Sequence, residues 1–248
     1  MRCEILGIAF DTLTLPQAVD RARVFLAGDA PRTVATPNAE IVQQARKNPA
    51  AREAINAADL VLPDGIGVIR AARILGLPIR ERVAGIDFAQ ALLPVLAETG
   101  ALVYFLGASP GVAEEAARRA AEAHPGLRVC GVRDGYFADG SQPDVADAIR
   151  AAGAHAVFVC LGAPKQELFM RQYAARTGAR LLVGLGGTFD VWAGRLKRAP
   201  QLFIRLNLEW LYRTLRQPKR LFRTLRLPAF LWAARRAKNK TNGSREAL

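Results

Sequence analysis

The chain has 248 residues, of which 51% are hydrophobic and 23% charged, so it is long enough for one large α/β domain with a core and is not intrinsically disordered. Its net charge of +13 resides in residues 195–248, which contain fifteen lysines and arginines but only Glu209 and Glu246 as acids. No apolar run reaches the ~18–20 residues that a membrane-spanning helix needs, and the N-terminus shows no secretion signal. We therefore expect a cytoplasmic protein whose membrane contact is peripheral.

Short apolar runs alternate with helical patterns along residues 1–194, and this alternation is typical of a parallel sheet with crossover helices. The predicted strands are Glu4–Ala9, Thr33–Ala35, Leu60–Leu62, Leu102–Leu106, Arg128–Val132, Ala156–Leu161 and Leu181–Leu185. The predicted helices are Pro16–Leu26, Ala39–Lys47, Ala50–Ala57, Gly67–Leu75, Asp87–Glu98, Val112–Ala123, Asp144–Ala152 and Lys165–Arg176. Proline near the helix starts and glycine after the helix ends support these limits. We expect one α/β body over residues 1–194.

The alternation ends near Gly194, and the remaining residues combine basic charge with large apolar side chains. Prolines divide this segment into helical pieces, and in Lys219–Arg226 the apolar and basic side chains fall on opposite faces. We expect residues 195–240 to form a basic, amphipathic helical appendage and residues 241–248 to be disordered. A solvated basic face on an ordinary helix is the alternative. The joint recurrence of charge and apolar bulk favours docking on an anionic membrane surface.

Cysteine and histidine usage indicates neither a disulfide nor a metal site. Cys3, Cys130 and Cys160 are far apart and lie in or beside predicted strands, so we expect buried, reduced thiols. His124 and His155 have no cysteine, histidine or carboxylate at the spacing of metal ligands. We expect no metal and no cofactor.

Polar residues follow two of the early predicted strands, at the end of a parallel sheet where ligands bind. Thr36 and Asn38 offer a hydroxyl and an amide, although Asn38 could equally be only a helix cap. Asp64 follows a buried strand in the dipeptide Asp64-Gly65, which is also a good turn sequence. A carboxylate held rigidly at a strand end suits a general base.

Three later strand ends also carry candidate ligand-binding loops. Gly107–Gly111 lies between a strand and a helix, where backbone N–H groups could face a phosphate, but Ser109 breaks the Gly-x-Gly-x-x-Gly pattern. Gln166 lies in the first turn of a predicted helix, and Asp190 lies in a predicted loop after glycines 184, 186 and 187. Each loop alone is a weak signal for nucleotide binding.

Taken together, these loops resemble the WecG/TagA/CpsF glycosyltransferase family. The matching pieces occur in one order, and the resemblance spans about residues 5–226, nearly the whole chain, so chance similarity is a poor explanation. They are TPNAEIV (36–42), ADLVLPDGIGV (58–68), RVAGIDF (82–88), FLGASPGV (105–112), GYF (135–137), LGAPKQE (161–167), GGTFDVWAG (186–194) and RAP…LEWLYR…QPKRLFR (198–223).

The resemblance implies a Rossmann-like parallel sheet with helices on both faces and a C-terminal appendage that docks at the membrane and completes the active site. It implies an inverting transfer of an N-acetylmannosamine-type sugar from UDP to a polyprenyl-diphosphate-linked N-acetylglucosamine, in the synthesis of bacterial surface polysaccharide or teichoic acid. No Asp-x-Asp pair, the usual metal holder of metal-dependent sugar-nucleotide transferases, occurs in the chain. We expect a metal-independent enzyme on the inner face of the cell membrane.

The resemblance also assigns roles to individual residues. Asp64 matches the proposed general base, and Thr36 and Asn38 match polar residues of the sugar pocket that we include with it among the catalytic residues. The substrate-binding residues that it implies fall into four sets. Two residues shape the sugar pocket, two lie in the Gly107–Gly111 turn, three contact the nucleotide, and three arginines of the appendage reach the diphosphate. They are Arg82, Asp87, Gly107, Ser109, Tyr136, Gln166, Asp190, Arg213, Arg220 and Arg223.

Two other classes of protein remain as alternatives. The sequence pI of about 10.6 suits a nucleic-acid-binding protein, but the chain shows no RNA- or DNA-binding motif and we expect no nucleic-acid partner. Another Rossmann-type nucleotide-binding enzyme would need Gly-x-Gly-x-x-Gly and an acidic ribose partner some twenty residues on, and both are missing after Gly107. The sequence leaves the oligomeric state open, self-association included.

Overall fold

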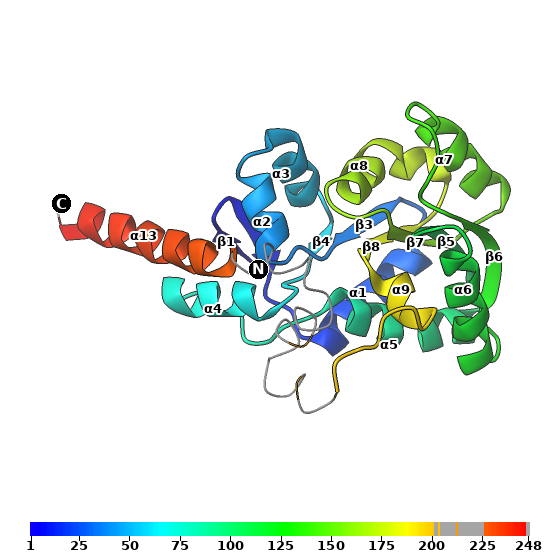
Figure 1. The fold of residues 1–248 in the computed structure, drawn as a ribbon, viewed down its shortest axis with the longest axis horizontal. Helices are drawn as coiled ribbons and strands as arrows, with labels where there is room; N and C mark the ends of the chain where they lie inside the picture. The colour runs from blue at the N-terminus through cyan, green and yellow to red at the C-terminus, as the bar shows by residue number, and fades with distance from the viewer. Residues whose placement is uncertain (201–202, 204–211, 213–225, 247–248) are drawn as a thin grey trace.

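Six parallel strands form the central sheet of the computed structural model, which describes residues 1–200, 203, 212 and 226–246 (Figure 1). Their order across the sheet is β4-β3-β8-β7-β5-β6. The strands are β3 (Arg32–Ala35), β4 (Leu60–Val61), β5 (Leu102–Gly107), β6 (Arg128–Arg133), β7 (Ala156–Cys160) and β8 (Leu181–Gly184). The predicted α/β class and parallel sheet are confirmed.

Helices cover both faces of this sheet, as predicted. They are α1 (Leu15–Ala27), α2 (Ala39–Ala45), α3 (Pro49–Asn56), α4 (Ile66–Leu75), α5 (Gly85–Thr99), α6 (Val112–Ala123), α7 (Gln142–Ala151), α8 (Lys165–Thr177), α9 (Thr188–Trp192) and α13 (Arg226–Glu246). Along β5, Val103 and Phe105 face a core with α1, α5, α6 and α9, whereas Tyr104 and Leu106 face α7 and α8. This alternation follows from the two-residue period of a strand and makes both faces apolar.

The N-terminal segment differs from its prediction. In place of one strand over Glu4–Ala9, the chain forms an antiparallel hairpin of β1 (Arg2–Ile5) and β2 (Ile8–Asp11). Leu6 and Gly7 both have positive φ, 52° and 88°, as a two-residue hairpin turn requires. The prediction was wrong because a leucine carries no turn signal, and the apolar run therefore appeared continuous.

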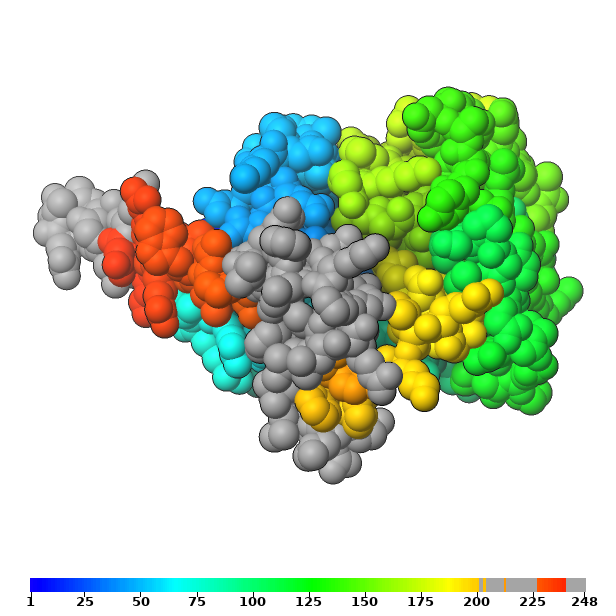
Figure 2. All heavy atoms as spheres, viewed as in Figure 1, coloured from blue at the N-terminus to red at the C-terminus, as the bar shows by residue number. Residues whose placement is uncertain are grey.

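The C-terminal helix α13 packs on the body beside α4 and α2 (Figures 1 and 2). Phe230 and Ala234 are fully buried in a core cluster that also contains the hairpin β1–β2 and residues of α2, α3 and α4. Gly67 permits the close approach, because a Cβ there would lie 2.7 Å from Leu227 and 2.8 Å from Ala39. This part of the expected appendage is therefore joined to the body core.

The far end of the C-terminal segment belongs to helix α13, which extends to Glu246. The disorder expected for residues 241–248 stays a prediction. The predicted helix Lys219–Arg226 lies outside the described residues except for Arg226. Within the described part of the chain, no helix combines the length and apolar character needed to cross a membrane.

His155 makes the stability of this fold depend on pH. Its Nδ1 accepts a hydrogen bond from the backbone N–H of Leu102 at 2.9 Å, and burial, aided by Arg180 and Arg128, lowers its pKa. The His155 imidazole therefore binds a proton more readily in the unfolded chain than in the folded one. Its contribution to the free energy of unfolding is complete above pH ~6.5 and is lost as the pH falls through the lowered pKa of the folded state. Denaturant unfolding should show that the free energy of unfolding falls less between pH 7.5 and pH 5.5 in His155→Gln than in wild type. His124→Gln is the control, and equal losses in all three proteins would contradict the assignment.

Candidate active site

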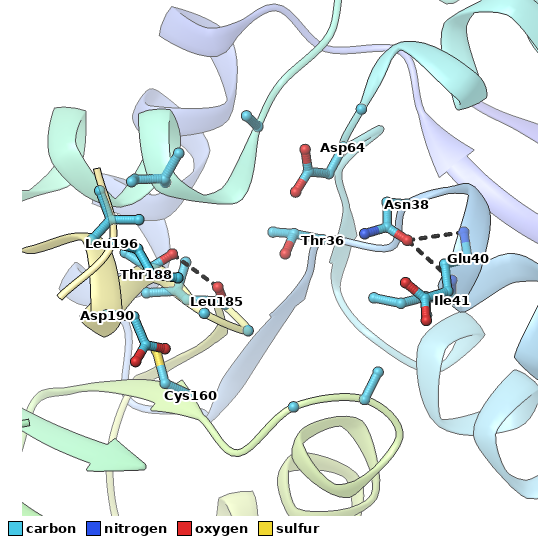
Figure 3. Close-up of a pocket in the computed structure, with 18 of the residues that line it drawn as sticks. Thr36, Asn38, Glu40, Ile41, Asp64, Cys160, Leu185, Thr188, Asp190 and Leu196 are labelled. Carbon is cyan, nitrogen blue, oxygen red and sulfur yellow. Dashed lines mark hydrogen bonds between the residues drawn. The ribbon is translucent and has the colours of Figure 1, made fainter. Parts of the chain in front are cut away.

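A cavity of about 1110 Å³ lies at the carboxyl ends of the sheet strands. The loops that follow all six strands contribute to its wall, as the geometry of parallel sheets requires of a ligand site. In Figure 3, Thr36, Asn38 and Asp64 lie on one side of this space, and Leu185, Thr188 and Asp190 lie on the other. The structure therefore brings together loops that are far apart in the chain.

Thr36 and Asn38 follow β3 and are both held by backbone groups. The Thr36 hydroxyl is buried and donates to the Gly184 carbonyl at 2.7 Å, so its lone pairs are what it can offer a ligand. Asn38 caps α2, since its Oδ1 accepts from the N–H groups of Glu40 and Ile41 at 3.0 and 3.1 Å. The cap orients the side chain, and its Nδ2 group points into the cavity toward Thr36 (Figure 3). The cap and ligand-binding interpretations are thus compatible.

Asp64 lies in the loop between β4 and α4 and lines the cavity. Gly65 after it has φ 82° and begins α4, a backbone conformation that favours glycine and explains the Asp-Gly dipeptide. The preceding Pro63 carbonyl accepts from the Val83 N–H at 3.1 Å, which joins this loop to the Arg82 segment. The loop therefore holds the carboxylate on a rigid frame at the cavity wall.

Arg82 lines the cavity, whereas Asp87 lies outside its wall and binds two arginines. The Arg82 guanidinium contacts the Asp87 carboxylate at 3.4 Å. The other oxygen of Asp87 binds Arg198, which also donates to Gln90 at 3.2 Å. Asp87 is not among the lining residues; it bridges Arg82 to Arg198, which lies in the first residues of the expected appendage. Its placement in the first turn of α5 also suits the helix dipole.

The Gly107–Gly111 turn reaches the cavity only through Ala108 and Ser109. Gly107 has φ 123°, and a Cβ there would collide with the backbone of Cys160, so its role is the close approach of β5 to β7. Cys160 also lines the cavity, but burial raises the pKa of its thiol and keeps it neutral. Gly107 therefore shapes the site without lining it, which differs from the substrate contact that we expected.

Tyr136 and Asp190 lie at the cavity wall. Tyr136 is 75% exposed, which leaves its ring accessible to a planar base. Asp190 lies in the first turn of α9 and not in a loop as predicted, because residues 188–192 form a short helix with Phe189 buried against Phe105. That packing partner is distant in sequence, so no local pattern revealed the helix.

Comparison with known families identifies the family to which the chain belongs. The family model described as "Glycosyl transferase WecG/TagA/CpsF family" matches residues 3–244. The chain belongs to this family of glycosyl transferases. A Bacillus spizizenii strain W23 protein named N-acetylglucosaminyldiphosphoundecaprenol N-acetyl-beta-D-mannosaminyltransferase is 41% identical over 200 residues, covering 81% of this chain and 77% of that protein. A Staphylococcus aureus strain MW2 protein of the same name is 32% identical over 241 residues, covering 96% of this chain and 94% of that protein.

Gln166 of this glycosyl transferase lines the cavity but is itself 1% exposed. Its Oε1 accepts from the Gly186 N–H at 3.0 Å, and its Nε2 donates to Glu167 at 2.9 Å. Gln166 therefore holds the loop after β8, and little of it remains for direct contact with a ligand. Glu167 was missed in the sequence, although it ends the LGAPKQE segment beside Gln166.

Other members of the cavity wall were also missed in the sequence. Arg195 and Lys197 add two exposed cations, and Leu227 adds an apolar contact from the first turn of α13. The charge excess of residues 195–248 was the only signal for the first two. Arg213, Arg220 and Arg223 of the glycosyl transferase lie outside the described residues, so their proposed roles remain predictions.

The described part of this glycosyl transferase contains no group of three His, Cys, Asp or Glu side chains that could hold a metal ion. Glu40, Asp64 and Asp190 all line the cavity, but Asp64 and Asp190 face each other from opposite sides in Figure 3. The cations Arg82, Arg195 and Lys197 line the same space. These three side chains place positive charge at the cavity wall.

Proposed function

We propose that this protein transfers an N-acetylmannosamine-type sugar from UDP to a polyprenyl-diphosphate-linked N-acetylglucosamine, in bacterial surface polysaccharide or teichoic acid synthesis. The observation that carries the proposal is the meeting of Thr36, Asn38 and Asp64 at one wall of the cavity in a member of this family. The names of the two relatives, which specify the transferred sugar and the lipid-linked acceptor, support the choice of substrates.

The proposed reaction is an inverting displacement. A hydroxyl oxygen of the acceptor sugar forms a bond with the anomeric carbon of the donor, and the bond from that carbon to the phosphate oxygen breaks, so UDP leaves with the electron pair. Asp64 accepts the hydroxyl proton, a role that accounts for ~10²–10⁴-fold in rate. Thr36 and Asn38 lie beside it and orient the sugar hydroxyl groups.

In this proposal, side chains and backbone groups of the protein stabilise the leaving diphosphate. Arg82, Arg195 and Lys197 line the cavity, and the Ala108–Ser109 backbone follows β5 there. Arg213, Arg220 and Arg223 would add charge from the appendage. Cations placed at the cavity wall lower the energy of the negative charge that develops on the leaving diphosphate. The lack of an Asp-x-Asp pair supports a mechanism without a metal.

A transfer assay tests this function directly. Full-length protein is incubated with UDP-N-acetylmannosamine and a synthetic polyprenyl-diphosphate-linked N-acetylglucosamine, with and without EDTA. We expect product in both conditions, with the anomeric configuration inverted. Binding of UDP without transfer would keep the transferase class and reject this donor sugar. Loss of activity with EDTA would reject the metal-independent mechanism, and absence of both transfer and UDP binding would reject the function.

We also propose that the protein acts at an anionic membrane surface, on its cytoplasmic side. Trp232 on α13 is 61% exposed, and the Arg236 guanidinium lies 5.4 Å from the centre of its ring. Arg235, Arg236 and Lys238 are exposed on the same helix. An aromatic ring with neighbouring cations suits the boundary between lipid head groups and acyl chains.

Liposome binding checks the membrane proposal. Each basic residue near an anionic surface contributes ~1 kcal/mol, so we expect sedimentation with phosphatidylglycerol liposomes that weakens as salt rises. Phosphatidylcholine liposomes and a DNA duplex serve as controls. Salt-independent binding would contradict the electrostatic contribution, and tighter binding to the duplex would favour a nucleic-acid partner.

A further inference from the structure

Glu167 is a buried carboxyl group directly behind the cavity wall. It lies in the first turn of α8 and is 2% exposed. Its Oε1 accepts a hydrogen bond from the Gln166 Nε2 at 2.9 Å, and its Oε2 is buried without a partner among the described residues. Burying a polar atom without a partner costs free energy, so an apolar residue would serve packing better. Packing therefore does not explain why residue 167 is an acid.

The acceptor that Glu167 provides determines how the Gln166 amide is oriented. The backbone N–H of Gly186 can only donate, so it requires the oxygen of this amide, and Oε1 accepts from it at 3.0 Å. The amide nitrogen must then face the other way, where Glu167 receives it. The site leaves little room for adjustment, since a Cβ on Gly184 would lie 3.0 Å from the Gln166 Nε2.

The groups that this amide holds belong to the cavity. Leu185, Gly186 and Gly187 line it, and Gly186 has φ 57°, so the chain turns sharply at the point where Gln166 binds it. The carbonyl of Gly184, one residue before this loop, accepts from the Thr36 hydroxyl at 2.7 Å. The orientation of one amide thus affects both the loop after β8 and the residues around Thr36.

We propose that Glu167 is a positioning residue, which fixes the Gln166 amide so that the Leu185–Gly187 loop keeps the shape needed to bind the UDP part of the donor. The proposal rests on the donor assigned above. Burial raises the pKa of Glu167, which favours the uncharged acid. Glu167→Gln is therefore the closest replacement, because its amide keeps an oxygen that can accept from the Gln166 Nε2. Glu167→Met fills a similar space but offers no such oxygen.

The test uses full-length wild type, Glu167→Met and Glu167→Gln, with Gln172→Met on the exposed face of α8 as a matched control. Hydrogen exchange of the Leu185–Gly187 amides is first measured without nucleotide. We expect faster exchange in Glu167→Met, and rates near wild type in Glu167→Gln and in the control. Unchanged exchange in Glu167→Met would overturn the proposal, whatever the outcome with UDP.

Calorimetric titration with UDP then connects the loop to the ligand. An unpartnered buried amide is expected to weaken UDP binding about tenfold in Glu167→Met, with substantial recovery in Glu167→Gln. Equal weakening in both variants would overturn the role of the acceptor oxygen. If wild type fails to bind UDP while the exchange result holds, the donor assignment is wrong and the positioning of the loop stands. Thermal unfolding of each variant separates this local effect from a general loss of stability.

Discussion

Replacing Asp64 with Asn is expected to lower the rate of sugar transfer by ~10²–10⁴-fold while UDP binding stays nearly unchanged. The amide retains the shape of the carboxylate but cannot accept the proton of the attacking hydroxyl. The loop that carries residue 64 is fixed by Gly65 and by the bond from Val83 to Pro63, so the substitution should leave the frame intact. Steady-state transfer rates and calorimetric UDP titrations of both proteins measure the effect.

A second carboxylate of the cavity is the matched control for Asp64→Asn. Glu40 lines the same space from the first turn of α2, so Glu40→Gln removes one negative charge without removing the proposed base. We expect a much smaller loss of rate in this variant. Near-normal transfer by Asp64→Asn would reject the base assignment. Equal losses in the two variants would assign the effect to the charge of the cavity instead.

Phe230→Ala is expected to reduce the free energy of unfolding by ~3–5 kcal/mol, the usual cost of truncating a fully buried phenylalanine. Phe230 is 0% exposed and belongs to the core cluster that joins α13 to α4 and to the hairpin β1–β2. Its removal leaves a cavity where these elements meet. Guanidinium unfolding of wild type and variant measures the change.

Trp232→Ala serves as the control for Phe230→Ala, because this large aromatic residue of the same helix is mostly exposed. We expect a change within about 0.5 kcal/mol in its unfolding free energy and a loss of liposome binding. A loss of stability below about 1 kcal/mol in Phe230→Ala would show that α13 is not part of the cooperative core. The two variants thus separate the stabilising face of α13 from the face that we propose contacts the membrane.

The burial of α13 also changes what a truncation would show. An appendage that completes the active site, as the family resemblance implies, predicts that deletion from about residue 195 leaves a folded body with little activity. With Phe230 and Ala234 in the core, the same deletion is expected to expose apolar surface on α4 and to promote self-association. Single replacements of Arg213, Arg220 and Arg223 by alanine are therefore the better test of a catalytic contribution from the appendage.

Much of the α/β body could be predicted from the sequence because its signals are local. Glycine and proline mark helix ends, and the predicted helix Val112–Ala123 coincides with α6. Parallel strands bring their carboxyl ends to one edge of the sheet, so the strand pattern places Thr36, Asn38 and Asp64 at the same edge. The pairing of β3 with β4, which brings them close together, is shown by the structure. Their meeting in the cavity follows from topology more than from side-chain detail.

Other features were decided by contacts between residues far apart in the chain. Asp87 lies between Arg82 and Arg198, and Phe189 packs on Phe105, which makes a helix of the segment with Asp190. The hydrogen bonds that link Glu167 and Gln166 to Gly186 depend on where β8 ends relative to α8. The burial of Phe230 depends on the packing of α13 against α4. Local sequence records backbone preference and periodicity, whereas these pairings are determined by the packing of the whole core, and only the tertiary structure shows them.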